Sequence, residues 1–143
     1  MSFHLKFVMP SHPRYLCIVR AAVGEVGLVH GLPEESCQGV TLAVDEALAN
    51  VIRHAYKGRH DQEVELNCRT VDDRLEFTLL DHGEAPDPAR ICGQPMDEVS
   101  LSGRGTHLIK AVMDEVCYER VPRGNQLTLI KYLPAAKVGA DKK

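Results

Sequence analysis

The strongest constraint on the fold is one long helix pattern that runs from Pro33 to Tyr56. Glu34 and Glu35 place negative charge in its first turn, where the helix dipole favours it. The apolar residues recur at the i, i+3, i+4, i+7 spacing of a stripe that faces a core: Val40, Ala43, Val44, Ala47, Leu48, Val51, Ile52 and Ala55. The pattern therefore predicts a helix that is anchored in a core along one side.

Two polar residues, Glu46 and Asn50, lie four positions apart on one flank of this stripe. At that spacing their side chains sit one above the other. A carboxylate and an amide oxygen aimed into the same space suit a proton acceptor beside a hard cation, because Mg²⁺ takes oxygen ligands and keeps positions for phosphates and water. The alternative interpretation is a solvated helix face, on which Glu and Asn at this spacing are common.

Length, charge and cysteine usage limit the class of protein. A chain of 143 residues is the size of one domain, and we expect that domain over residues 1–134, followed by a disordered tail over 135–143. The 17 basic and 20 acidic residues are scattered, which argues against direct binding of nucleic acid. Five cysteines without a C-x-x-C pair predict free thiols in a reducing cytoplasm. No apolar run approaches the roughly 20 residues that span a bilayer, so we expect a cytoplasmic protein away from membranes.

The remaining patterns predict about five strands and three helices. Strand alternation is seen near the start, in a hairpin before residue 81 and in a closing hairpin, and helical spacing follows Ser11, a candidate cap, and again follows Gly105. Residues 82–102 lack periodicity and predict a long binding loop or lid. This order favours a two-layer α+β sandwich, in which three helices cover one face of a mixed, mostly antiparallel sheet.

Two short glycine motifs are further candidates for a site. Asp81 and Gly83 stand at a strand end, where a carboxylate can accept a proton from an exocyclic amine and a glycine lets a flat ligand approach. An ordinary β-turn is the alternative. The run from Gly103 to Thr106 leads from the long loop into a helix, whose free N–H groups can bind phosphate, although a hinge with a helix cap has the same composition.

The order and setting of these three motifs resemble the ATP-binding fold of the gyrase, Hsp90, histidine kinase and MutL superfamily, the Bergerat fold. Within that superfamily, the segments around Glu46 and Gly105 look most like the anti-sigma factor serine kinases. The resemblance implies a general base at Glu46 and a Mg²⁺ ligand at Asn50. It implies nucleotide contacts at Asn50, Asp81, Gly83, Gly103, Arg104, Gly105, Thr106 and Thr128, with Thr128 near the adenine.

The resemblance also implies a function and partners. It predicts an ATP-dependent protein serine kinase, with ATP or ADP and Mg²⁺ as cofactors, that phosphorylates an anti-anti-sigma partner of the STAS type, binds a sigma factor and forms a homodimer. The first alternative is an ATP-binding anti-sigma switch with little or no kinase activity. The second is a detached histidine-kinase catalytic domain, although the chain shows no preceding dimerisation helices with a phospho-acceptor histidine.

Overall fold

The computed structural model describes residues 2–84 and 103–134, with the side chains of residues 103–106 left aside. The elements follow one another in this order: β1 (His4–Pro10), the short 3₁₀ turn η1 (Pro13–Tyr15), α1 (Leu16–Val29), α2 (Glu34–Asn50), the π-helical turn η2 (Val51–Ala55), β2 (Glu63–Val71), β3 (Arg74–Asp81), α3 (Gly103–Val112), β4 (Glu115–Val121) and β5 (Gly124–Tyr132). The predicted strands and helices are all present in the described residues. The predicted loop over 82–102 and the tail over 135–143 lie almost wholly outside them.

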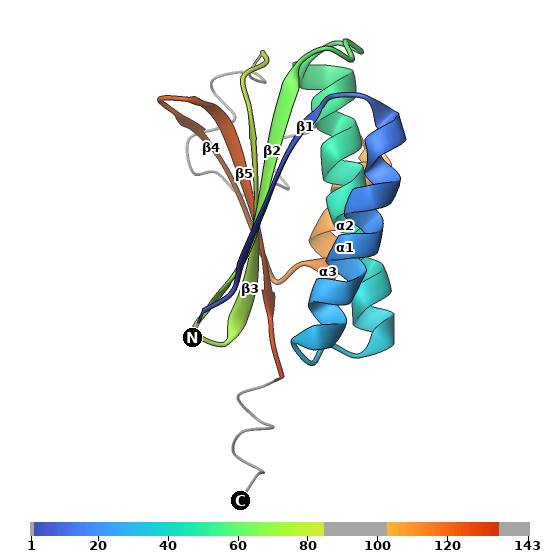
Figure 1. Ribbon diagram of the computed structural model, residues 1–143, viewed down its shortest axis with the longest axis vertical. Helices are drawn as coiled ribbons and strands as arrows, with labels where there is room; N and C mark the ends of the chain where they lie inside the picture. Colours follow the sequence, from blue (N-terminus) through green and yellow to red (C-terminus); the bar gives the residue numbers. More distant parts are fainter. Residues whose placement is uncertain (1, 85–102, 135–143) are drawn as a thin grey trace, which may run out of the picture.

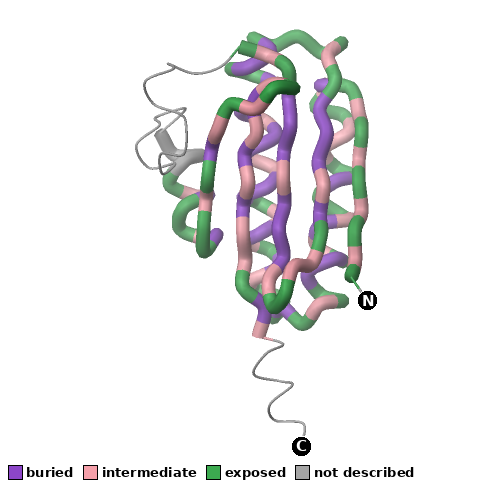
Figure 2. The backbone as a smooth tube through the Cα atoms, turned by 90° about the vertical axis from the view of Figure 1, so that its left-hand side faces the viewer, coloured by how far each residue is buried: buried purple, intermediate pink, exposed green. Residues whose placement is uncertain are grey.

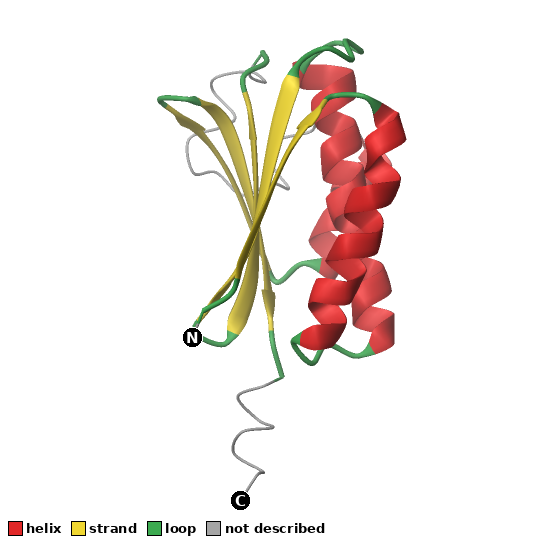
Figure 3. Ribbon diagram, in the orientation of Figure 1, coloured by secondary structure: helices red, strands yellow, loops and turns green. Residues whose placement is uncertain are grey.

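The five described strands form one open sheet in the order β1-β2-β3-β5-β4. Each neighbouring pair is antiparallel, so the sheet described here is fully antiparallel and not mixed. Helices α1, α2 and α3 all lie against the same face of the sheet (Figures 1 and 3). The predicted two-layer α+β sandwich is confirmed.

Strand periodicity decides which side chains face the helices. In β3 and β5, alternate residues such as Phe77, Leu79, Leu127 and Leu129 are buried in the core with the apolar stripe of α2. Figure 2 shows the central strands with the helices behind them, and the degree of burial changes along each strand. Residues of the opposite parity, such as Thr128, therefore lie on the sheet face away from the helices.

Helix α2 lies between α1 and α3 and makes close contacts with both. A side-chain carbon at Gly27 of α1 would lie 2.8 Å from the sulfur of Cys37, so these two helices approach closely there. On its other side, Gly39 near the start of α2 faces Val112 at the end of α3. Because α2 and α3 run in opposite directions (Figure 1), the first turn of α3 lies toward the Asn50 end of α2.

The ends of the helices show one wrong prediction. Ser11 does not cap the first helix, because its hydroxyl donates to the carbonyl of Arg59 at 2.7 Å. The cap of η1 is His12, whose Nδ1 accepts from the N–H of Arg14 at 3.1 Å. Within the described part of the chain, no helix has both the length and the apolar character needed to cross a membrane.

Candidate functional site

The Glu46 and Asn50 side chains of α2 share one positively charged neighbour, Arg53 of η2. The Nη2 atom of Arg53 donates to Asn50 Oδ1 at 2.8 Å and to Glu46 Oε2 at 3.1 Å. Asn50 is only 5% exposed, whereas the side chains of Glu46 and Arg53 are 26% and 50% exposed. The predicted proximity of the Glu46 and Asn50 side chains is therefore present in the structure, and both oxygens are directed at one cation.

Asp81 ends β3 as a buried carboxylate, with 3% of its surface exposed. Its Oδ1 accepts from the N–H of Gly83 at 2.9 Å and from Nδ2 of Asn125 at 2.8 Å. Burial raises the pKa of Asp81 above its ordinary 3.8, and these two hydrogen bonds and the nearby His82 only partly offset that effect. A carboxylate held in this way is a rigid acceptor at the end of a central strand.

The turn after Asp81 packs directly on the end of the helix that carries Asn50. The N–H of Glu84 donates to the carbonyl of Ala55 at 2.9 Å, and the N–H of His82 donates to the Tyr56 hydroxyl at 2.8 Å. A side-chain carbon at Gly83 would lie 2.4 Å from the Ala55 oxygen, so only glycine fits there. Asp81 and Asn50 are thus fixed relative to one another, since Ala55 lies only five positions beyond Asn50.

Asn125 is a member of this cluster that the sequence did not predict. It opens the paired part of β5 opposite Asp81, is 1% exposed, and also donates from Nδ2 to the carbonyl of Gly83 at 3.0 Å. Its Oδ1 is buried and accepts no hydrogen bond from any described residue. The preceding Gly124 has a φ of +145° and leaves room for the Asp81 carbonyl.

Thr128, predicted to lie near the adenine, does not join the cluster. It pairs with Thr78 on β3 and lies on the sheet face away from the helices, whereas Asp81 and Asn125 lie on the face toward them. The residue opposite Asp81 is Asn125. The structure therefore places Asn125, and not Thr128, beside Asp81, the residue that is predicted to contact the adenine.

The predicted phosphate-binding segment forms the first turn of α3. Gly103, Arg104, Gly105 and Thr106 all have helical backbone, so the helix begins two residues before the predicted Gly105. Their backbone supplies the N-terminal end of a helix near the Asn50 end of α2. The roles of their side chains stay predictions, because those side chains lie outside the described part of the structure.

Comparison with known proteins identifies the domain. The family described as the histidine kinase-like ATPase domain matches residues 9–131. The chain belongs to this family. The matched range runs from the end of β1 into β5 and contains every residue of the cluster around Asn50 and Asp81.

Relatives and solved structures agree with this assignment. The serine-protein kinase RsbW of Bacillus subtilis is 27% identical over 146 residues, which cover 96% of this chain and 91% of that protein. RsbW of Bacillus pumilus is 28% identical over 147 residues, with coverage of 96% and 90%. Among solved structures, the RsbU and RsbW domains of Rv1364c from Mycobacterium tuberculosis match with a TM-score of 0.62 and 17% identity, over 92% of this chain and 32% of that one. The histidine kinase domain of the blue-light activated kinase EL346 from Erythrobacter litoralis matches with a TM-score of 0.60 and 18% identity, over 94% of this chain and 66% of that one. The last two likenesses show the fold.

The oxygens of this histidine kinase-like domain fit a magnesium ion. Asn50 Oδ1 already contacts one positively charged nitrogen, which shows that a cation can reach this almost fully buried oxygen. Mg²⁺ is usually held by one or two protein oxygens, with waters and substrate phosphates in its other positions. Asn50 Oδ1 would hold Mg²⁺ here, and Glu46 would lie next to the ion without being one of its ligands.

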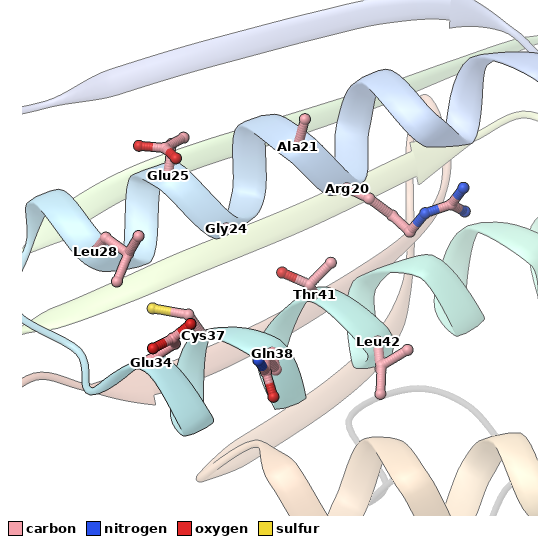
Figure 4. Close-up of a pocket in the computed structure, with 10 residues that line it drawn as sticks. All are labelled: Arg20, Ala21, Gly24, Glu25, Leu28, Glu34, Cys37, Gln38, Thr41 and Leu42. Carbon is pink, nitrogen blue, oxygen red and sulfur yellow. The ribbon is translucent and has the colours of Figure 1, made fainter.

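Several other features of the chain are not part of the cluster. His54 and His107 are exposed, and Asp45 pairs with Arg20 of α1 at 2.8 Å. The described cysteines, namely Cys17, Cys37, Cys68 and Cys117, are free thiols, as predicted. A groove of about 530 Å³ lies between α1 and α2 (Figure 4), and its lining residues include Gly24, Leu28 and Thr41 but none of the cluster.

Proposed function

We propose that this domain binds ATP with Mg²⁺ and transfers the γ-phosphoryl group to a serine of an anti-anti-sigma partner of the STAS type. We propose further that it binds and inhibits a sigma factor. Membership of the histidine kinase-like ATPase family supports nucleotide binding, and similarity to RsbW serine-protein kinases over nearly the whole chain supports the choice of reaction and partners. The observation that carries the kinase proposal is the closeness of the Glu46 carboxylate to the Asn50 oxygen on α2, since both accept from the same nitrogen of Arg53.

The cluster assigns a role to each group in phosphoryl transfer. Asp81, held by Asn125 and Gly83, would accept a hydrogen bond from the amino group of adenine. The start of α3 would direct N–H groups at the phosphates. Bound Mg²⁺ would neutralise charge on the phosphoryl group in transfer. Glu46 would accept the proton of the seryl hydroxyl as its oxygen bonds to the γ-phosphorus and the bond to ADP breaks.

A second function is favoured by the contact between Arg53 and Glu46. The guanidinium group of Arg53 occupies Glu46 Oε2, and an oxygen held in this way is not open to a seryl hydroxyl. If the contact between Arg53 and Glu46 persists when ATP is bound, the domain would act as an ATP-binding anti-sigma switch with little or no kinase activity.

Glu46→Gln separates the two functions, because it keeps the shape of the side chain and removes the base. We expect the variant to bind ATP with an affinity close to that of the original chain, and to lose phosphate transfer to a partner by about 100-fold or more. Asp45→Asn is the matched control, since Asp45 is the neighbouring carboxylate and pairs with Arg20 instead. Labelled ATP, the partner and phosphoserine mapping give the measurement. Transfer at the original rate by Glu46→Gln would show that Glu46 is not the base.

We also propose that the protein is a cytoplasmic homodimer. The resemblance to anti-sigma factor kinases supports both statements. Sedimentation velocity at several protein concentrations tests the dimer, and a species of monomer mass, near 15.8 kDa, at every concentration would exclude it.

A further inference from the structure

Arg53 places a positive charge where the proposed function requires a metal ion. A single nitrogen, Nη2, donates to both Asn50 Oδ1 and Glu46 Oε2. The three residues are spaced at i, i+4 and i+7 along the continuous helix of α2 and η2, so their side chains share one face. The guanidinium group thus contacts the oxygen that would hold the metal ion and the oxygen of the proposed base beside it.

The burial of the three side chains shows how this contact can be exchanged. Asn50 is almost fully buried, whereas half of the Arg53 side chain is in contact with solvent. The Asn50 oxygen, which would bind the metal, is therefore held in place by the fold. The positive charge that covers it belongs to Arg53, a long side chain at the surface. Arg53 can leave the Asn50 oxygen without any change in the core.

Mg²⁺ and the guanidinium group cannot both occupy the position in front of Asn50 Oδ1. Mg²⁺ binds its ligands at about 2.0–2.1 Å, and the Arg53 nitrogen lies 2.8 Å from Asn50 Oδ1, so the two cations compete for one position and repel one another. We propose that Arg53 is a positioning residue that occupies the metal position of the empty site and must be displaced when Mg²⁺ and nucleotide bind. This proposal rests on the proposed function. Its consequence is that competition from Arg53 raises the Mg²⁺ concentration that nucleotide binding requires.

Displacement of Arg53 has a consequence for Glu46. The same movement that opens Asn50 to the metal also removes the hydrogen bond from Glu46 Oε2. Glu46 Oε2 is then open to the seryl hydroxyl of a partner. Arg53 therefore links occupancy of the metal position to the accessibility of Glu46 Oε2.

Arg53→Met tests the competition, because it keeps a long side chain and removes the charge. The Mg²⁺ concentration that gives half-maximal binding of a fluorescent ADP analogue should fall by about tenfold, the size expected for loss of a hydrogen bond to a charged group. Arg20→Met is the matched control, since Arg20 makes an ion pair of 2.8 Å with the neighbouring Asp45, and it should leave the requirement unchanged. Arg53→Lys keeps the charge, so its half-maximal Mg²⁺ concentration should lie closer to that of the original chain than the value for Arg53→Met does.

A second measurement does not depend on nucleotide. Mn²⁺ alone is added to the nucleotide-free protein, and broadening of the Asn50 side-chain amide signal is followed by NMR. Arg53→Met should show the broadening at about tenfold lower Mn²⁺ than the original chain or Arg20→Met.

The two measurements separate the inference from the function on which it rests. If the original chain binds no ADP analogue but Arg53→Met gains affinity for Mn²⁺, the proposed function is wrong and the competition stands. If the analogue binds, and Arg53→Met has the original or a higher requirement for both metals, the competition is wrong and nucleotide binding stands.

Discussion

At the scale of single residues, Asp81 is a charge that the fold holds at a cost. Its pKa is raised above 3.8 chiefly by burial, so the folded state disfavours the ionised form. Stability is therefore lost as the pH rises from 3.8 through the pKa of the folded state, and the full cost is present at neutral pH. We predict that Asp81→Asn raises the thermal unfolding midpoint at pH 7, and that this gain shrinks near pH 3.5. The amide oxygen of the variant can still accept from Asn125 and Gly83.

The proposed adenine contact predicts that the same variant fails to bind ATP, because an amide N–H₂ group would replace the carboxylate oxygen that is proposed to accept from the adenine amino group. Glu76→Gln is the control, since Glu76 is also a buried carboxylate but has two arginine partners, Arg69 at 3.0 Å and Arg74 at 3.4 Å. Its neutralisation should lower the midpoint. A lower midpoint in Asp81→Asn, or retained ATP binding measured by calorimetry, would contradict this account of Asp81.

Residue spacing predicted part of the cluster and missed another part for a physical reason. The proximity of Glu46 and Asn50 follows from helix geometry alone, and the Asp81 turn from its place at a strand end. Asn125 gives no signal of a binding role in the sequence, because Gly followed by Asn is typical of an ordinary turn. The resemblance predicts Thr128 near the adenine, and the structure places it on the sheet face away from the helices, because a shift of one residue in a strand moves a side chain to the other face. Register depends on partner strands and cannot be fixed from one segment.

At the scale of elements, two glycines of α1 provide a matched pair of substitutions. A side-chain carbon at Gly24 would make an ordinary contact of 3.5 Å with Thr41 Oγ1, whereas one at Gly27 would lie 2.8 Å from Cys37 Sγ. Gly24→Ala should stabilise the protein by about 0.5–1 kcal/mol, because alanine loses less backbone entropy in a helix. Gly27→Ala should destabilise it, since α1 would have to move away from α2. Urea denaturation measures both, and equal effects of the two changes would refute close packing at Gly27.

Periodicity predicted the elements well where the apolar stripe was long. Helix α2 together with η2 covers the predicted range from Pro33 to Tyr56 closely, and the hairpin of β2 and β3 ends at Asp81 as predicted, because burial on one side fixes both patterns. The π-helical turn η2 had no signal in the sequence, since it depends on how the end of the helix meets the turn after Asp81. Ser11 was misassigned as a cap because its partner, Arg59, is distant in sequence.

At the scale of the whole molecule, the segment before α1 is joined to the segment before β2. Ser11 donates to the Arg59 carbonyl and accepts from the N–H of Gln62 at 3.1 Å. The rings of His12 and His60 lie 4.6 Å apart between their centroids. The segment before α1 and the segment before β2 are thus linked outside the core, and the link includes the rings of His12 and His60.

This link should make stability depend on pH through His12. Desolvation, and then the charges of Arg14 and His60, lower the pKa of His12 below its ordinary 6.5, so folding favours the neutral ring. The neutral ring is also required for Nδ1 to accept from the Arg14 N–H. The contribution of His12 is therefore fully present above pH 6.5 and is lost as the pH falls through the lowered pKa of the folded state.

His12→Asn isolates this effect, because an asparagine oxygen can cap the same turn without titrating. We predict that the urea midpoint of the original chain falls more between pH 7.5 and pH 5.5 than that of His12→Asn. All other acidic and basic groups are common to the two proteins, so the difference between their pH profiles belongs to His12 and its partner ring. Parallel profiles would show that the contact between the two histidines does not bear on the stability of the fold.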